Sequence, residues 1–269
     1  MEASGPRNSA RIPTASAYGA PMRIGTWNVE YAPGTDKNER RLRRLREMNA
    51  DLWILTETHD RLVPGNDYRA ASTTPRPAKG PEGARWTTIW SRYPITRSVK
   101  VADPDRTVAA IIETPLGPLL VYGTVLPRHT DGGPSGKEPH WSEHHRVVPL
   151  QAKEWVALRE AHPGIAMCVA GDFNMNLGGP HVYGTTMGRE KLREGLEAAG
   201  LVCLTETERV PEEQLRHGAI DHIAVSAALA EGATLVGAWE GTDSDGVRLS
   251  DHSGLVVEIG RATPVTDPT

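Results

Sequence analysis

Short runs of apolar and β-branched residues recur along this chain, and they constrain its fold more than any other feature. Turn-forming Gly, Pro, Asn, Asp or Ser residues lie between the runs, which is typical of β-strands. Two runs, Ile165–Gly171 and Gly254–Ile259, are apolar on both faces, as expected for a sheet that is covered on both sides. The pattern predicts these strands: Arg23–Asn28, Leu52–Thr56, Trp86–Ser91, Thr107–Glu113, Leu119–Val125, Ile165–Gly171, Ala219–Ser226, Thr234–Trp239 and Gly254–Ile259.

Helical periodicity is confined to three segments, Asn38–Met48, Val147–Ala161 and Arg189–Ala199. The chain has 27 glycines and 21 prolines, which is too many for a helical bundle. No linker-like stretch interrupts the middle of the chain, so we expect one domain. We predict an α/β fold in which two sheets pack face to face with helices outside, because this arrangement buries both faces of each sheet.

The two ends of the chain differ from its middle. Residues 1–21 are small, polar and aperiodic and predict a disordered leader, with a degenerate targeting peptide as the alternative. Residues 261–269 are interpreted as a tail, which leaves 22–260 as the domain. Within it, Pro127–Arg146 is the longest segment expected to be irregular, and loops of that length are often functional.

Composition excludes several classes of protein. No run approaches the roughly 18 apolar residues that a membrane span needs. A net charge of −4 argues against a strongly basic nucleic-acid coat. The two cysteines, Cys168 and Cys203, are too few for a disulfide scaffold or a four-cysteine zinc site. Because no secretory signal is present, we expect a cytoplasmic protein; its oligomeric state stays open.

Polar side chains stand directly after or before the apolar runs. Oxygen-bearing residues occur in this way at five separate strand ends, and one of them adds a histidine: Asn28 and Glu30; Glu57; Asp172 and Asn174; Asp221; Asp251 and His252. Singly, each is most simply a turn former or a helix cap. Residues two apart in an extended chain point the same way, so Asn28 with Glu30, and Asp172 with Asn174, could each direct two oxygens at one point.

Convergence of so many carboxylates would need a compensating positive charge, because like charges near buried strands repel and are costly to desolvate. A hard divalent cation is the simplest solution. Oxygen ligands without clustered Cys or His favour Mg²⁺ or Mn²⁺ over zinc. If these residues converge, the pattern therefore indicates a bound hard dication.

Six motifs in this order and spacing closely resemble the endonuclease/exonuclease/phosphatase superfamily: GTWNVE, LTETH, SRYPI, GDFNMN, IDHIAVS and LSDHSGLVVEI. The resemblance covers residues 22–260. It implies a four-layer α/β/β/α sandwich of two mixed β-sheets. It also implies hydrolysis of phosphoester bonds by metal-assisted attack of water.

The resemblance also implies roles for single residues. Glu57 would be the principal metal ligand, supported by Asn28, Glu30 and Asp251. Asp172 and Asn174 would orient the attacking water and contact the scissile phosphate. His252 would be the catalytic histidine and Asp221 the carboxylate that holds it, since a neighbouring carboxylate makes an imidazole more basic. Mechanisms in the family divide on whether the histidine or the aspartate is the base, and the sequence leaves that open, together with the number of metal ions.

One position departs from the family pattern. Many nucleases of the family carry Tyr or His where this chain has Val125, and His129 or Arg128 could take over the contact with phosphate. Trp141 and the basic groups near it could form a lid over the substrate; a second metal site or plain packing are the alternatives. Of the remaining histidines near the motifs, His222 is expected to be packing or surface, and His59 a loop residue.

Three functions remain open at this stage. The first is a metal-dependent phosphodiesterase or endonuclease, with nucleic acid as a possible partner. The second is a phosphomonoesterase or a lipid- or inositol-phosphate hydrolase on the same fold. The third is a catalytically inactive binding module. The arginine-rich helix Asn38–Met48 does not decide among them, because a solvated helix face explains it equally well.

Overall fold

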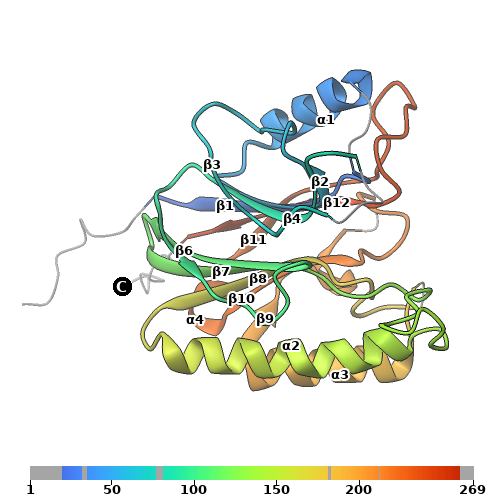
Figure 1. Ribbon diagram of the computed structural model, residues 1–269. Helices are drawn as coiled ribbons and strands as arrows, with labels where there is room; N and C mark the ends of the chain where they lie inside the picture. Colours follow the sequence, from blue (N-terminus) through green and yellow to red (C-terminus); the bar gives the residue numbers. More distant parts are fainter. Residues whose placement is uncertain (1–19, 32–34, 77–80, 181–182, 212, 261–269) are drawn as a thin grey trace, which may run out of the picture.

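Two six-stranded β-sheets lie face to face and form the centre of the molecule (Figure 1). This computed structural model describes residues 20–31, 35–76, 81–180, 183–211 and 213–260. The strands are β1 (Met22–Asn28), β2 (Leu52–His59), β3 (Arg69–Ser72), β4 (Ala84–Ser91), β5 (Ile95–Val99), β6 (Thr107–Thr114), β7 (Gly117–Val125), β8 (Ala166–Asp172), β9 (Leu201–Cys203), β10 (Asp221–Ser226), β11 (Thr234–Trp239) and β12 (Gly254–Ile259).

The first sheet has the strand order β11-β12-β1-β2-β4-β3 and the second β5-β6-β7-β8-β10-β9. Each contains one parallel pair, β1 with β2 and β7 with β8, among antiparallel neighbours. Both sheets are therefore mixed, as predicted.

Helices cover the two outer faces. The described helices are α1 (Thr35–Met48), α2 (Ser142–Ala161), α3 (Thr186–Ala198) and the short α4 (Ala227–Ala230), with a 3-10 turn at Thr207–Arg209. Figure 1 shows α1 over the first sheet and α2 and α3 side by side over the second. The layers are thus α/β/β/α. None of the described helices has the length and apolar character to cross a membrane.

Central strands contribute side chains to two apolar layers at once. In β8, Cys168 and Ala170 pack between the two sheets, whereas Met167 and Val169 pack against the layer of α2 and α3. Because side chains alternate along a strand, both faces must be apolar here. A third layer, containing Trp27, lies between α1 and the first sheet.

The nine predicted strands are all present, with ends shifted by a few residues, but three further strands were not predicted: β3, β5 and β9. Each of these lies at the edge of a sheet. The side chains of β3 and β5 are mostly exposed, and β9 has three residues. Edge strands bury little apolar surface, so their sequences carry no clear apolar pattern.

Helix α2 begins at Ser142, five residues before the predicted start at Val147, so the irregular segment expected over Pro127–Arg146 is shorter than predicted. The first turn of α2 buries the polar residues Glu143 and His144, which an apolar pattern does not detect. Apart from Ala20 and Pro21, the expected leader (1–21) and tail (261–269) lie outside the described residues.

The topology brings the ends of distant strands to one edge of the sandwich. The parallel pairs place the carboxyl ends of β1 and β2, and of β7 and β8, side by side. Asp221, at the start of β10, is in register with Asp172 at the end of β8. His252 lies two residues before the first residue of β12, which runs antiparallel to β1 and so begins at the same edge.

We expect Gly25→Ala to lower the free energy of unfolding by about 1–3 kcal/mol, the usual cost of overpacking a core. A Cβ at Gly25 would lie 2.2 Å from Cζ3 of the Trp53 ring, which is fully buried and cannot easily move. Gly260→Ala is the matched control, because its Cβ would have Pro21 Cβ at 3.8 Å as neighbour. Urea unfolding measures both. Equal stability of the two variants would contradict the packing described here.

Candidate active site

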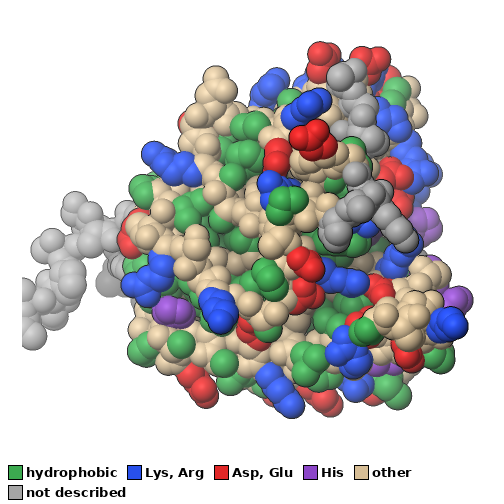
Figure 2. Space-filling view, viewed as in Figure 1, with side chains coloured by type: hydrophobic (Ala, Val, Ile, Leu, Met, Phe, Trp, Pro, Cys, Tyr) green, Lys and Arg blue, Asp and Glu red, His purple; other side chains and the backbone are tan. Residues whose placement is uncertain are grey.

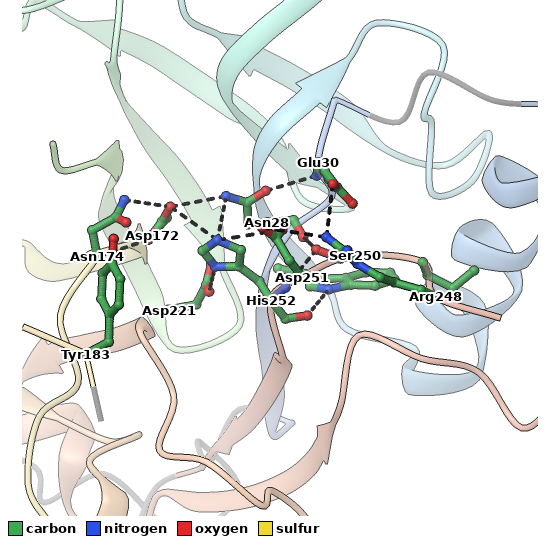
Figure 3. A network of polar contacts seen from close by, with 12 residues as sticks. Asn28, Glu30, Asp172, Asn174, Tyr183, Asp221, Arg248, Ser250, Asp251 and His252 are labelled. Carbon is green, nitrogen blue, oxygen red and sulfur yellow. Dashed lines mark hydrogen bonds and ion pairs between the residues drawn. The ribbon is translucent and has the colours of Figure 1, made fainter. Parts of the chain in front are cut away.

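A hydrogen-bonded network of five polar side chains, from the ends of β1, β8 and β10 and from the loops after β8 and before β12, lies at this edge (Figure 3). Its centre is the Asp172 carboxylate. Asn28 Nδ2, from the end of β1, donates to Asp172 Oδ2 at 3.1 Å. Asn174 Nδ2 donates to the same oxygen at 2.9 Å, and Asn174 N donates to Oδ1 at 2.8 Å. The remaining two members are Asp221 and His252.

Asn174 has one polar atom left for a ligand. Its Nδ2 also donates to Leu126 O at 3.0 Å, so both amide hydrogens are used within the protein. The residue has a φ of 48°, in the left-handed region, where strain at functional sites is often found. Asn174 lines a cavity, and its Oδ1 is the atom free to accept from a bound molecule.

His252 is held by two buried carboxylates. Its Nδ1 lies 2.6 Å from Asp221 Oδ2, and its Nε2 lies 4.0 Å from Asp172 Oδ2. Burial alone would lower the pKa of His252, but the charges of Asp221, Asp172 and Asp251 raise it to about 10. The other Asp221 oxygen is buried and accepts no hydrogen bond from the described residues. These charges favour the protonated form of the imidazole, whose Nε2 lies 3.4 Å from Asn28 Nδ2 and 4.0 Å from Asp172 Oδ2.

Burial has the opposite effect on the two aspartates. It raises the pKa of Asp172 and of Asp221, although the positive charge of His252 counteracts it in both. Both side chains are 1% exposed, so solvent does little to stabilise their charge. The network thus combines an imidazolium with a carboxylate that is unusually basic.

Two buried neutral histidines hold the backbone around Asn174. His144 Nε2, from α2, donates to Phe173 O at 3.1 Å, and His222 Nε2 donates to Met175 O at 2.9 Å. His222 Nδ1 accepts from Thr205 Oγ1 at 3.1 Å. The expectation that His222 is a packing residue is thus confirmed, since it is fully buried and points away from His252's carboxylates.

Gly171 allows the strand before Asp172 to approach its neighbour. Its φ is 134°, and a Cβ there would lie 2.1 Å from Thr124 O on β7. No other residue fits without separating β7 from β8. The Gly-Asp pair therefore positions Asp172 through the backbone as well as through hydrogen bonds.

The four residues expected to bind metal lie around the network at different depths. Asn28 is buried, and its Oδ1 accepts from Glu30 N at 2.9 Å. Glu57 lies in β2, which continues past the predicted end at Thr56, and has a φ of 43°. Glu30 and Asp251 are more exposed, and both lie near Arg248, with N–O distances of 3.1 and 3.8 Å.

A hard dication fits these donors. Glu57, Asn28 and Asp251 offer only oxygens, the ligands that Mg²⁺ and Mn²⁺ prefer. Burial raises the pKa of Glu57, and the charges of His252 and Arg76 lower it only in part, so a cation beside it would be stabilising. Among the described residues, the one tight group of acidic and histidine side chains is Asp172, Asp221 and His252, with ligand atoms within 4.8 Å of one another. Within this group His252 pairs with Asp221 at 2.6 Å, and Glu57, the expected principal metal ligand, is not one of its members.

The residues expected to bind substrate are divided between two places. Arg128 is exposed and lines the same cavity as Glu57 and Asn174. His129 and Trp141 instead form an aromatic cluster with Tyr183, with ring centroids 5.1–5.9 Å apart. The loop histidines form no tight metal-ligating group within the described ranges.

Val125 is in register with Asp172 and lines the cavity, which puts an apolar side chain where family nucleases carry Tyr or His. Tyr183 lies next to Asn174 in Figure 3, and its hydroxyl is held by His129 Nδ1 at 2.8 Å. His129 thus contacts Tyr183 and is not among the residues that line the cavity. His59, expected in a loop, ends β2, and its Nε2 lies 2.6 Å from the backbone oxygen of Glu82, 23 residues further along the chain.

Several residues at the site were not predicted, chiefly Tyr31, Arg76, Trp86, Tyr183 and Ser250. Ser250 links two predicted residues, because its Oγ donates to Asn28 O at 2.6 Å and accepts from His252 N at 3.0 Å. Of these five, only Ser250 could have been found from the sequence, because it adjoins the Asp251-His252 pair. The others come from loops and from strand β4, whose sequences carry no motif.

Comparisons with known proteins agree with this geometry. The sequence model of the Endonuclease/Exonuclease/phosphatase family matches residues 25–252. No curated protein matches the chain by sequence. Several solved structures share its fold at low sequence identity.

The human Nocturnin catalytic domain with bound sulfate is similar at a TM-score of 0.64 and 17% identity, covering 89% of this chain and 94% of that one. The endonuclease domain of TRAS1, a telomere-specific non-LTR retrotransposon, is similar at 0.60 and 16%, covering 89% and 98%. An endonuclease/exonuclease/phosphatase from Beutenbergia cavernae is similar at 0.55 and 17%, covering 90% and 72%. At these identities the likeness concerns the fold.

We expect Asp221→Asn to lower the pKa of His252 by about 1–3 pH units, because the charge that contributes most to raising it is removed. NMR titration of the imidazole in EDTA-treated protein measures this. Asp251→Asn is the control and should have a smaller effect, since Asp251 Oδ1 lies 4.0 Å from Nε2 and its side chain is 55% exposed. A His252 pKa unchanged by Asp221→Asn would contradict the pairing.

Burial lowers the pKa of His222 to about 4, so the folded protein keeps this side chain neutral. The unfolded chain, with a histidine pKa of about 6.5, binds the proton more readily below that pH. The stabilisation is therefore complete above pH 6.5 and falls by about 1.4 kcal/mol per pH unit toward pH 4. We expect the stability advantage of the wild type over His222→Gln to shrink by about 2 kcal/mol between pH 6.5 and 5 in urea unfolding. A constant advantage would refute this.

Proposed function

Because the chain belongs to the endonuclease/exonuclease/phosphatase family, we propose that it is a divalent-metal-dependent hydrolase of phosphoester bonds, and specifically a phosphodiesterase of the endonuclease type. One observation carries the proposal: His252, held by Asp221 at 2.6 Å, faces Asp172, which Asn28 and Asn174 orient. In such a pair the carboxylate can accept a proton from the attacking water while the imidazolium donates a hydrogen bond to a phosphoryl oxygen.

The metal would be held by Glu57 and Asn28, with Asp251 and Glu30 nearby. When bound, Mg²⁺ or Mn²⁺ would polarise a phosphoryl oxygen and offset the negative charge that develops in the transition state. Glu30 is the weakest candidate, because its carboxylate already pairs with Arg248.

The protein's own groups account for the movement of protons. Asp172, whose pKa burial raises, accepts a proton from the attacking water, and Asn174 Oδ1 orients that water. The water oxygen bonds to phosphorus, the bond from phosphorus to the leaving oxygen breaks, and the leaving oxygen takes a proton from solvent. His252 donates Nε2–H to a phosphoryl oxygen, and Asp221 stabilises the imidazolium throughout. In this mechanism the general base is Asp172 and not His252.

The substrate is proposed to be a nucleic acid or a similar phosphodiester. The acidic and basic side chains are interspersed on the face in Figure 2, so that face has no extended basic stripe for a duplex. Val125 favours the second candidate, a phosphomonoesterase or a lipid- or inositol-phosphate hydrolase, because the polar contact of the family nucleases is missing at this position. The intact network disfavours an inactive binding module.

We expect His252→Ala to retain less than a tenth of the wild-type rate, because a positioned proton donor or acceptor contributes about 10²–10⁴-fold. The assay uses plasmid, abasic duplex, single-stranded RNA, an inositol phosphate and a lipid phosphodiester, with Mg²⁺ or Mn²⁺ and with EDTA. Asp172→Ala is the blank, and His217→Ala, at an exposed histidine, is the matched control.

The panel separates the candidates. Hydrolysis of a nucleic acid that EDTA abolishes supports the endonuclease, and hydrolysis of the inositol phosphate alone supports the second candidate. Activity of His252→Ala above a tenth of wild type would refute the assigned role. A wild type that hydrolyses no substrate in the panel would revive the binding module.

A further inference from the structure

An arginine-rich cavity opens beside the network, and the hydrolysis mechanism does not use its arginines. The cavity has a volume of about 390 Å³. Glu57 and Asn174 form part of its wall, and so do Arg76, Arg106 and Arg128. It is therefore continuous with the place where the reacting phosphate would bind.

Arg76 is held by aromatic rings. Its guanidinium carbon lies 4.1 Å from the ring centroid of Tyr31 and 4.1 Å from that of Trp86. Other arginines, such as Arg23 and Arg85, pair with carboxylates at 2.9 Å. Within the described part of the chain, the Arg76 guanidinium has no hydrogen bond or contact ion pair. Cation–π contacts fix its position but leave its N–H donors available.

Arg106 and Arg128 place two further cations in the same cavity. Arg106 lies over Trp86 at 5.5 Å and donates to Asp131 Oδ2 at 2.7 Å, which orients it. Arg128 is exposed. Trp86 itself is the cross-strand neighbour of Glu57, since Thr56 pairs with Thr87 and Thr58 with Arg85. The arginines thus gather next to the proposed metal ligand.

The charges in this cavity do not balance. Three guanidinium groups share it with the carboxylates of Glu57 and Asp131, and a cation bound at Glu57 would increase the excess. The reacting phosphodiester carries one negative charge and would contact Asn174 and His252. A second anionic group is needed to use the remaining donors, and a guanidinium matches a phosphate through paired N–H bonds.

We infer that Arg76, with Arg106 and Arg128, binds a second phosphate group of the substrate, next to the phosphate that is hydrolysed. This inference rests on the proposed function and narrows it to substrates with two neighbouring phosphates. Such a phosphate is present both in an oligonucleotide chain and in a multiply phosphorylated inositol.

Binding without turnover tests the subsite. Calorimetry on EDTA-treated protein compares the thymidine dinucleotide TpT with pTpT and TpTp, and, in a separate arm, inositol monophosphate with inositol bisphosphate. In one of the two arms, we expect the wild type to bind the ligand with the extra phosphate at least tenfold more tightly. The arm that shows this preference tells whether the second phosphate belongs to a nucleotide chain or to an inositol. Arg76→Gln should lose this preference while its affinity for the one-phosphate ligand stays within twofold.

Two further variants make the result decisive. Arg97→Gln, at an exposed arginine on β5, should keep the preference. Arg76→Lys retains the charge but lacks the planar fork, so it should keep only part of the preference and also tests the subsite if Arg76→Gln does not fold. A wild type without any preference, or a full preference in either Arg76 variant, overturns the subsite.

The result is separable from the proposed function. A preference lost in Arg76→Gln, in a protein that hydrolyses none of the substrates, would support the subsite and refute the hydrolase. Hydrolysis that depends on His252, in a protein that does not prefer the ligand with the extra phosphate, would support the hydrolase and refute the subsite.

Discussion

The contact between His252 and the buried carboxylate of Asp221 is the interaction on which the site depends. A buried aspartate is costly unless a positive partner compensates it, and the 2.6 Å contact provides that partner. The same contact fixes the ring so that Nε2 faces Asp172. Three carboxylates raise the pKa of His252, which supports the donor role proposed for it.

The scaffold around this contact is rigid for identifiable reasons. His144 donates to Phe173 O and His222 to Met175 O, the carbonyls on either side of Asn174 in the sequence. Arg189 adds a third anchor by donating to Asn176 O at 2.9 Å. A backbone held at three points can keep Asn174 in a strained conformation, which is the condition for placing its Oδ1 accurately.

Positive charge is held differently in the network and in the cavity beside it. In the network, buried aspartates surround the His252 imidazole. In the cavity, Arg76 is held by Tyr31 and Trp86 and has no carboxylate partner among the described residues, which leaves its charge available to a ligand. The proposed chemistry therefore rests on residues of the family motifs, and the proposed second-phosphate site on residues outside them.

The sequence by itself determined the nine main strands, the sandwich of two covered sheets and the polar residues at strand ends. These features are local: alternation along a strand reports two buried faces, and a motif such as GDFN needs no distant partner to be recognised. The edge strands and the first turn of α2 escaped prediction because they bury little apolar surface or bury polar groups instead.

Only the tertiary structure decided how the polar residues are used. His222 and His252 each follow an aspartate in the sequence, yet one binds Met175 O and the other pairs with Asp221. Likewise, nothing in the sequence around Arg76 distinguishes it from other arginines, whereas the fold places it between Tyr31 and Trp86. Charge, burial and hydrogen-bond partners depend on residues far apart along the chain, so the role of each group was settled when the two sheets came together.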